Sequence, residues 1–387
     1  MQLPPGFNSS QSSGKVCRLR KALYGLKQSP RAWFGRFIEA MKRIGYHQGN
    51  SDHTLFIKQK NGKVTLLIIY VDDMIVTGDD TDEIKKLQEC LSTEFEMKDL
   101  GGLKYFLGIE VARTKDGIYL SQRKYILDLL SETGMLECKP VESPIVQNHR
   151  LAIHPYQVPT NKERYQRLVG RLIYLSHTRP DIAYAVSVVS QFMHAPSEDH
   201  MTAVMRILSY LKGAPGKGLT FKRHGTMEVK GFTDADWAGN LTDRRSTSSY
   251  FTFVAGNLVT WRSKKQNATA RSSAEAEYRG MVHGICELLW LRTLLTEIGF
   301  EPKDPMLLYC DNQAAREIAN NPVQHDRTKH IEVDRHFIKE KLLLKLVDIP
   351  FVRSSEQLAD ILTHAVPAEA LHKSLDKLGL EDIFAPT

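Results

Sequence analysis

Four acidic residues in the C-terminal third of the sequence stand where a metal-dependent phosphodiester hydrolase needs them. Asp234 ends an apolar strand, Glu277 lies near the start of a long helix, Asp311 ends the next strand, and Asp360 opens a late helix. Acids at the ends of neighbouring strands and on an adjacent helix can converge on one site. There, two Mg²⁺ ions about 3.5–4 Å apart, held by carboxylate oxygens, activate a water and steady the leaving oxygen. Taken singly, each acid is most simply a surface residue, so only the surrounding sequence distinguishes them.

Six segments around these acids follow one another in order between residues 229 and 363: GFTDADWAGN, DRRSTSSYFTFVAGNLVTWRSKKQ, ARSSAEAEYRG, YCDNQAA, NPVQHDRTKHIEVDRHFIKE and LADILT. Together they resemble the ribonuclease H domain of copia-type retrotransposon polyproteins. The resemblance implies that Asp234, Glu277, Asp311 and Asp360 are catalytic and hold two Mg²⁺ ions, for which Mn²⁺ can substitute. In SSAEAEY two glutamates compete for the second position. Glu277 fits the family pattern better, and Glu275 is the alternative.

A second pair of acids, Asp72 and Asp73, follows Tyr70-Val71 between two apolar runs. Asp alone commonly forms turns for local reasons. The longer segments KVCRLRKALYGLKQSPRAWF, LLIIYVDDMIVTG, FEMKDLGGLKYFLGIEV and LSQRKYI, however, resemble the reverse transcriptase of the same family. The resemblance implies that Tyr70, Asp72 and Asp73 form the metal-binding hairpin of a polymerase, with Asp72 as a metal ligand. By the same resemblance, Gly25 and Ser29 lie in the loop that shapes the template and nucleotide pocket.

The family's polymerase also needs an Asp from an earlier strand, shortly before a stretch like MxQPPGF. This sequence begins at MQLPPGF, so we expect the strand with that Asp and most of the fingers to be absent. Asp72 and Asp73 would then be half of a metal site, and we expect no DNA synthesis by this chain alone.

Basic and polar residues near both sets of acids are candidates for contacts with nucleic acid. Lys and Arg neutralise phosphates, aromatic rings stack on bases, and an RNA/DNA hybrid is recognised by shape, phosphates and the 2′-OH. The candidates are Gly25, Lys27, Ser29, Arg31, Arg244, Arg245, Arg262, Lys264, Lys265, Ser272, Ser273, Asn312 and Gln313. Exposed turns, strand ends and helix caps explain each of them equally well. The expected partners are an RNA/DNA hybrid and template–primer nucleic acid, with no membrane.

The composition is that of an ordinary globular protein. The 387 residues carry a formal net charge of +7, with 42% hydrophobic and 25% charged residues, which excludes a disordered tail, a collagen-like chain and a small disulfide scaffold. The longest apolar run, 64–71, is far short of the roughly 18 residues of a membrane span. The N-terminus lacks the pattern of a signal peptide, and five scattered cysteines argue against disulfides and a zinc site. We therefore expect an intracellular protein, cytoplasmic or nuclear, that is not secreted.

Hydrophobic periodicity and turn signals predict a mixed α+β and α/β fold in three domains. The resemblance implies that residues 1–144 form a partial reverse-transcriptase palm and residues 226–387 a ribonuclease H-like domain with a five-stranded mixed sheet, with 145–225 as a helical connection. The expected strands are 55–60, 64–71, 74–77, 105–111, 118–120, 227–233, 248–254, 258–261, 306–310 and 347–352. The expected helices are 32–44, 81–95, three segments within 164–212, and then 273–298, 314–320, 331–346 and a terminal helix.

The function expected from the sequence is hydrolysis of the RNA strand of RNA/DNA hybrids by a metal-dependent endoribonuclease, beside an incomplete RNA-directed DNA polymerase. The alternative is a non-catalytic remnant of a degenerate retrotransposon that only binds nucleic acid. A junction resolvase or integrase on the same fold is disfavoured by the DNQ and RRSTS segments.

Overall fold

A computed structural model describes residues 16–384, apart from 21–22, 24, 116 and 321–331. The chain forms two compact units. The first comprises the described residues up to Asp99 together with Glu297–Gly299, and the second comprises Leu100–Thr296 and the described residues from Phe300 onward. The domain boundaries expected at residues 144 and 225 stay a prediction.

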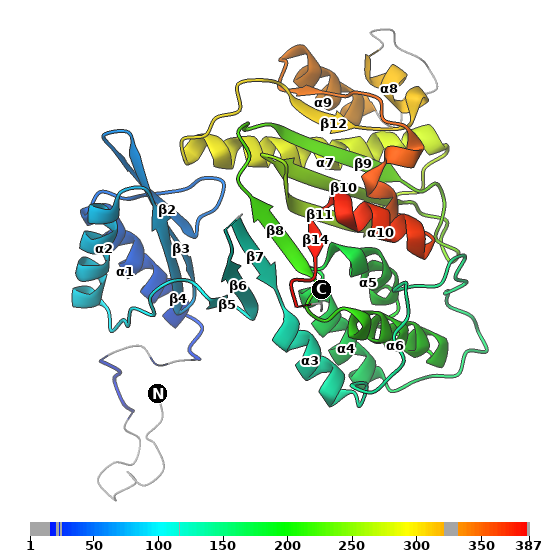
Figure 1. Cartoon of the computed structure of the whole chain (residues 1–387), viewed down its shortest axis with the longest axis horizontal. Coiled ribbons are helices and arrows are strands. Elements are labelled where there is room, and N and C mark those ends of the chain that lie inside the picture. The colour runs from blue at the N-terminus through cyan, green and yellow to red at the C-terminus, as the bar shows by residue number, and fades with distance from the viewer. Residues whose placement is uncertain (1–15, 21–22, 24, 116, 321–331, 385–387) are drawn as a thin grey trace, which may run out of the picture. The chain divides into compact units, whose positions relative to one another are not determined.

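The first unit is a four-stranded antiparallel sheet with two helices. Its strands pair in the order β1-β2-β3-β4, and Figure 1 shows α1 and α2 beside them. The elements are α1 (Ser29–Arg43), β1 (His47–Gln48), β2 (Leu55–Lys60), β3 (Lys63–Tyr70), β4 (Asp73–Gly78) and α2 (Thr81–Glu94). Burial alternates along β3, as in a strand with one covered face. Phe37 of α1, Leu67 of β3 and Leu87 of α2 share one core, so both helices pack on the same face of the sheet.

The second unit begins with an antiparallel sheet that joins distant parts of the chain. The strands, in the order β14-β8-β7-β6-β5, are β5 (Tyr105–Phe106), β6 (Ile109–Arg113), β7 (Gly117–Ser121), β8 (Gly218–Lys222) and β14 (Leu380–Glu381). The single strand expected at 105–111 is wrong, because Leu107 and Gly108 adopt positive φ angles of 49° and 82° and turn the chain between β5 and β6. The Tyr119 hydroxyl of β7 donates to the carbonyls of Gly216 and Glu381, which joins β7 to the segment before β8 and to β14.

Four helices follow in sequence around one apolar core. They are α3 (Arg123–Glu132), α4 (Lys162–Leu175), α5 (Ala183–Ser190) and α6 (Glu198–Gly213). Helices α4, α5 and α6 confirm the three segments expected within 164–212. Helix α3 was not expected, although Ile126, Leu129 and Leu130 occupy its buried face at the spacing typical of a helix.

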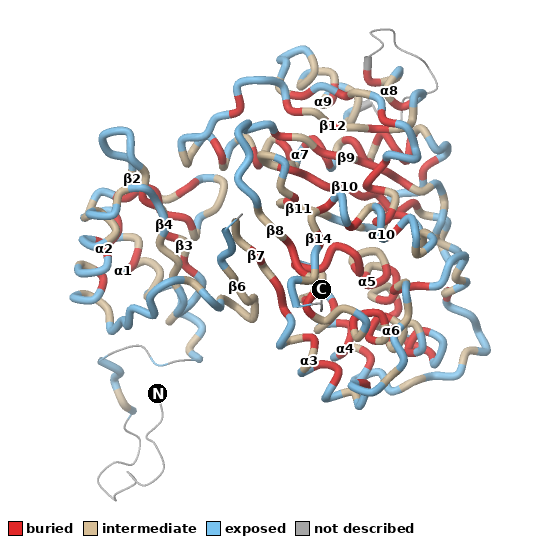
Figure 2. The backbone as a smooth tube through the Cα atoms, in the orientation of Figure 1, coloured by how far each residue is buried: buried red, intermediate tan, exposed pale blue. Residues whose placement is uncertain are grey.

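The third sheet has five strands and mixed direction, as expected for the C-terminal domain. Its order is β11-β10-β9-β12-β13, in which β9, β10 and β11 are antiparallel whereas β12 and β13 run parallel to β9. The strands are β9 (Val229–Ala235), β10 (Thr247–Val254), β11 (Asn257–Lys265), β12 (Met306–Tyr309) and β13 (Val347–Asp348). Figure 2 shows β9 and β10 as largely buried strands.

Helix α7 (Ser273–Glu297) crosses this sheet at very close range. A Cβ atom at Gly284 would lie 3.0 Å from the Leu308 side chain, and one at Gly280 would lie 3.3 Å from Thr233 Oγ1. The two glycines thus let the helix backbone approach β9 and β12, and they fix which face of α7 meets the sheet. The remaining helices are α8 (Gln313–Asn320), α9 (Glu332–Leu343) and α10 (Ala368–Lys377). Within the described residues, no helix is long and apolar enough to cross a membrane.

Candidate metal centre

Three of the four predicted acids meet where parallel strands end. Asp234 is the penultimate residue of β9, and Asp311 follows the neighbouring strand β12. Parallel strands end at the same edge of a sheet, so these two acids are brought to one place by the topology. Asp360 completes the group, with carboxylate oxygens of the three acids all within 4.8 Å of one another.

Asp360 does not open a helix, as the sequence suggested, but lies in the middle of a short 3₁₀ helix, η4 (Leu358–Leu362). Gln357 precedes this turn and fixes it in place. Its side-chain amide donates to the Thr233 carbonyl of β9 (2.9 Å), and its side-chain oxygen accepts from the Ala359 amide (3.3 Å). The carboxylate of Asp360 is therefore held beside β9 by the residue three positions before it.

The fourth acid, Glu277, reaches the centre from the first part of α7. Its carboxylate groups with Cys310 and Asp311 within 4.8 Å, and one of its oxygens, Oε2, is buried without a hydrogen-bond partner. Glu275, the alternative, does not join either acidic group of the described residues. It is engaged elsewhere, with Arg279 Nη2 and the Arg271 amide both at 2.8 Å. The geometry therefore brings Glu277, rather than Glu275, to the acidic cluster.

Within the described residues, no Lys or Arg forms an ion pair with the four carboxylates of the cluster. Burial raises the pKa of Asp234. Burial and the neighbouring Asp234 and Asp311 raise the pKa of Glu277 to about 10 and that of Asp360 to about 8. The orphaned buried oxygen of Glu277 and the all-oxygen donor set of these four acids fit a hard divalent cation, which would supply the missing charge.

Thr363 and His364, where the family usually has Thr-Lys, were expected from the sequence not to touch a metal ligand. That expectation is wrong, because both contact Asp234. The Thr363 hydroxyl donates to Asp234 Oδ2 and lies 2.8 Å from His364 Nδ1. His364 Nδ1 in turn lies 3.8 Å from Asp234 Oδ2. Nothing in the local spacing indicates these contacts, because they arise only when η4 folds back on β9. Cys310 is the other missed neighbour: it precedes Asp311, and burial together with Glu277 raises the pKa of its thiol.

The raised pKa values give a testable dependence of stability on pH. A carboxyl group that ionises at low pH in the unfolded chain, but only near pH 8 to 10 when folded, keeps its proton longer in the folded state. The stability it contributes is present at low pH and is lost as pH rises through its folded pKa. In EDTA, the melting temperature is therefore expected to fall between about pH 5 and about pH 9. Glu277→Gln, which cannot ionise, should flatten this decline relative to the unmodified chain in parallel scanning calorimetry. An equally steep decline in both proteins would contradict the prediction.

The second pair of predicted acids lies at an exposed hairpin of the first unit. Tyr70 of β3 pairs with Asp73 of β4, which leaves Val71 and Asp72 as the turn. Val71 has a φ of 53°, a left-handed conformation that is a genuine outlier for a β-branched residue. Backbone strain of this kind clusters at functional sites. Tyr70, Asp72 and Asp73 are all exposed. Within the described residues, no group of three potential metal ligands includes either acid.

The structure also places the predicted nucleic-acid contacts of the first unit. Gly25 has a φ of 89°, which requires glycine, and the Ser29 hydroxyl donates to the Leu23 carbonyl at 2.9 Å. Lys27 and Arg31 are exposed. Gly25 and Ser29 thus shape their loop, and the two cations are accessible.

Some predicted nucleic-acid contacts of the second unit already have partners within the protein, and others are exposed. Arg245 lies 3.7 Å from Asp243, and Asn312 caps α8 by accepting from the Ala315 amide at 2.9 Å. Arg244, at a φ of 56°, Lys264 and Gln313 are exposed. Contacts with nucleic acid at all of these positions stay a prediction.

Comparison with known proteins identifies the family. The family of reverse transcriptases (RNA-dependent DNA polymerases) matches residues 1–147. The chain is 42% identical over 380 residues to a retrovirus-related Pol polyprotein from transposon RE1 of Arabidopsis thaliana, covering 98% of this chain and 26% of that protein. It is 37% identical over 392 residues to the Pol polyprotein from transposon TNT 1-94 of Nicotiana tabacum, covering 98% and 29%. The chain thus spans about a quarter of the length of these relatives.

A solved foamy viral protease-reverse transcriptase in complex with an RNA/DNA hybrid is similar at a TM-score of 0.48 and 13% identity, covering 89% of this chain and 40% of that one. The sequence identity to the plant polyproteins extends over almost the whole chain, through both the hairpin and the acidic cluster. The chain therefore belongs to the family of copia-type retrotransposon Pol polyproteins.

Proposed function

We propose that the second unit is a metal-dependent endoribonuclease that hydrolyses the RNA strand of RNA/DNA hybrids. The observation that carries the proposal is the convergence of Asp234, Asp311 and Asp360 within 4.8 Å at the end of a five-stranded mixed sheet, with Glu277 beside Asp311. Family membership supports it, since the sequence around these acids resembles the ribonuclease H of copia-type polyproteins. The domain limits proposed for this activity are residues 226–387, preceded by a helical connection at 145–225.

The four carboxylates would hold two Mg²⁺ ions, with Mn²⁺ as a substitute. Bound there, the ions would supply an activated water and stabilise the departing oxygen of the cleaved phosphodiester. The chain's own residues position these ligands. Thr363 donates to Asp234 Oδ2 and orients that carboxylate, and Gln357 anchors the turn that carries Asp360. Burial of Asp234 and Glu277 keeps the ligands out of bulk water, so their charges act on a cation with little screening.

We assign Tyr70, Asp72 and Asp73 to the hairpin of the reverse-transcriptase domain, with template–primer nucleic acid as its partner. This assignment rests on the family match over residues 1–147 and on the exposed, strained turn at Val71. Hydrolysis alone is the activity proposed for this chain.

The proposal is tested by cleavage of a labelled RNA strand annealed to DNA, in Mg²⁺, with Asp234→Asn and Asp304→Asn compared. Asp234 is buried in the cluster, whereas Asp304 is an exposed loop residue with the same side chain. We expect cleavage by the unmodified chain and by Asp304→Asn, and none by Asp234→Asn, because its amide is a far poorer Mg²⁺ ligand than the carboxylate.

Two further outcomes distinguish the rival functions. A folded chain that binds the hybrid and leaves it intact would be a non-catalytic nucleic-acid-binding remnant, and the enzyme proposal would fail. Preferential cleavage of duplex DNA would point instead to a resolvase or integrase. A labelled DNA duplex of the same sequence therefore belongs in the same assay.

A further inference from the structure

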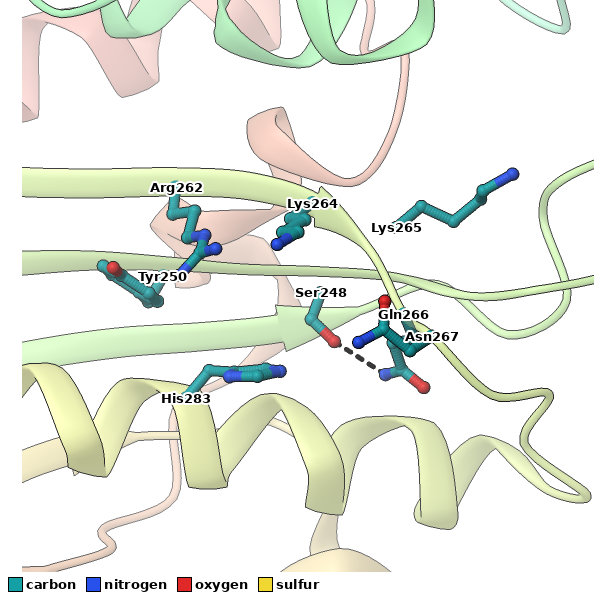
Figure 3. Close-up of a pocket in the computed structure, with 8 residues that line it drawn as sticks. All are labelled: Ser248, Tyr250, Arg262, Lys264, Lys265, Gln266, Asn267 and His283. Carbon is teal, nitrogen blue, oxygen red and sulfur yellow. Dashed lines mark hydrogen bonds between the residues drawn. The ribbon is translucent and has the colours of Figure 1, made fainter. Parts of the chain in front are cut away.

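A polar groove with cations on one wall lies beside the acidic cluster, between strands β10 and β11 and helix α7. It is lined by Ser248, Tyr250, Arg262, Lys264, Lys265, Gln266, Asn267 and His283, and it encloses about 360 Å³, including the part open to solvent. Figure 3 shows Arg262 and Lys264 on the strand side and His283 facing them from the helix.

The register of the sheet explains why two cations share this wall. Arg262 pairs with Tyr250, which pairs with Thr233, and Lys264 pairs with Ser248. Cross-strand partners point to the same face of a sheet, and Thr233 faces Gly280 of α7. Arg262 and Lys264 therefore point to the α7 side, where β11 is the edge strand.

The three cationic side chains of the groove differ in whether they form an ion pair with an acid. Lys265 points away in Figure 3 and forms an ion pair with Asp243 at 2.9 Å. Across the described part of the chain, neither Arg262 nor Lys264 forms an ion pair. Glu287 contacts the groove by accepting from the Tyr250 hydroxyl at 2.9 Å. Burial, together with Arg262 and Lys264, lowers the pKa of His283, although the negative charge of Asp334 opposes this shift.

The groove reaches the acidic cluster through Gln266. The Gln266 amide donates to Ser248 Oγ (2.6 Å) and to the carbonyl of Ala276 (2.9 Å), the residue before Glu277. Lys264 and Ser248 lie in the same cross-strand row as Ala235, the residue after Asp234. Because neighbouring strands are about 4.8 Å apart, Lys264 is about 10 Å from β9. A duplex carries one phosphate charge per about 1.7 Å of its axis, so a duplex bound at the cluster has other phosphates at that range.

We propose that the groove formed by Ser248, Arg262, Lys264, Gln266, Asn267 and His283 binds backbone phosphate of the nucleic-acid substrate beside the scissile bond. The inference rests on the proposed function, because it takes the acidic cluster as the place of cleavage. Arg262 and Lys264 supply the charge, and the Asn267 amide and the His283 ring supply further donors. Such contacts position the duplex without reading its sequence.

The test is the salt dependence of binding to a short fluorescent RNA/DNA hybrid, measured by anisotropy in EDTA so that nothing is cleaved. Arg262→Gln/Lys264→Gln is compared with Lys124→Gln/Lys373→Gln, which removes the same two charges from exposed i,i+4 pairs on α3 and α10. Each lost phosphate contact lowers the slope of log affinity against log salt by about 0.9. We expect the groove variant to lose about 1.8 from the slope, or about a twelvefold affinity difference between about 50 and about 200 mM salt. The control variant should keep the slope of the unmodified chain.

Lys264→Gln alone should lower the slope by about 1, which guards against a folding defect in the double variant. In Mg²⁺, the groove variant should raise KM and leave kcat within about twofold, because it removes no metal ligand. Equal slopes for groove and control variants would overturn the proposal, and so would a failure of the unmodified chain to bind the hybrid. If the chain binds with the expected slopes but never cleaves, the result supports phosphate binding in the groove and contradicts the proposed nuclease activity. If the chain cleaves the hybrid and the groove and control variants have equal slopes, only the phosphate-binding proposal is contradicted.

Discussion

Glu277→Gln is expected to reduce cleavage of an RNA/DNA hybrid by more than about 100-fold. Removing a residue that only supports a metal ligand typically costs about 10- to 100-fold, and Glu277 is itself a proposed ligand. The substitution keeps the shape of a buried side chain but removes the ionisable carboxyl group that lies near Asp311 and Cys310. Since Glu277 is one of the four proposed metal ligands, the effect should appear in kcat, and added Mg²⁺ should restore activity only in part.

Glu275→Gln is the matched control, two residues away on the same helix. Its carboxylate pairs with Arg279 at 2.8 Å and caps the Arg271 amide rather than joining the cluster. The control should therefore retain most of its activity and lose some thermal stability. Comparable losses of kcat in the two variants would show that the cluster as described is not the place of chemistry, and a larger loss in Glu275→Gln would exchange the roles of the two glutamates.

The choice between these glutamates shows how far sequence alone could go. Residues two apart on a helix point in very different directions, so the open question was which face of α7 meets the sheet. Gly280 and Gly284 lie three and seven residues after Glu277 and make the close approach to Thr233 and Leu308. They belong to the same helical stripe as Glu277. This spacing was visible in the sequence and would have favoured Glu277 on physical grounds.

Other parts of the structure were beyond a single sequence. The five strands of the third sheet follow from apolar runs, and they were predicted within a few residues. Strands β8 and β14 were not, because the two residues of β14 form a strand only by pairing with Leu219 and Gly218. The same limit applies to the site. Asp234, Asp311 and Asp360 stand at visible strand ends and turns, whereas the contacts of Thr363 and His364 with Asp234 arise only when η4 folds back on β9.

Asp181→Asn is expected to destabilise the second unit by about 3–5 kcal/mol, because it leaves a buried guanidinium without its counter-charge. Arg179 and Asp181 are both almost fully buried, with Nη2 and Oδ2 2.7 Å apart. The Tyr210 hydroxyl of α6 donates to the same Asp181 oxygen at 2.8 Å, and Arg179 Nη1 donates to the Ala214 carbonyl at 3.1 Å. This network joins the segment before α5 to the end of α6, and so stabilises the helical part of the unit.

The Arg179–Asp181 ion pair also predicts that the stability of the second unit depends on pH. Burial alone would raise the pKa of Asp181, but Arg179 and Tyr210 outweigh it and hold the pKa below its usual range. The stability that a lowered carboxyl pKa contributes is present above the unfolded pKa and is lost as pH falls through the folded one. Urea unfolding followed by circular dichroism at pH 7 should therefore show a large shift in midpoint for Asp181→Asn, and a smaller one near pH 3.

Two variants separate the loss of the ion pair from a general loss of charge. Arg167→Gln removes a cation that pairs with Glu132 at the surface, and it should cost at most about 1 kcal/mol. Replacing both buried partners, in Arg179→Met/Asp181→Leu, should cost less than Asp181→Asn alone, because no unpaired charge remains buried. If the double replacement is as unstable as the single one, the hydrogen bonds from Tyr210 and to Ala214 carry the stability, and the charge pair does not.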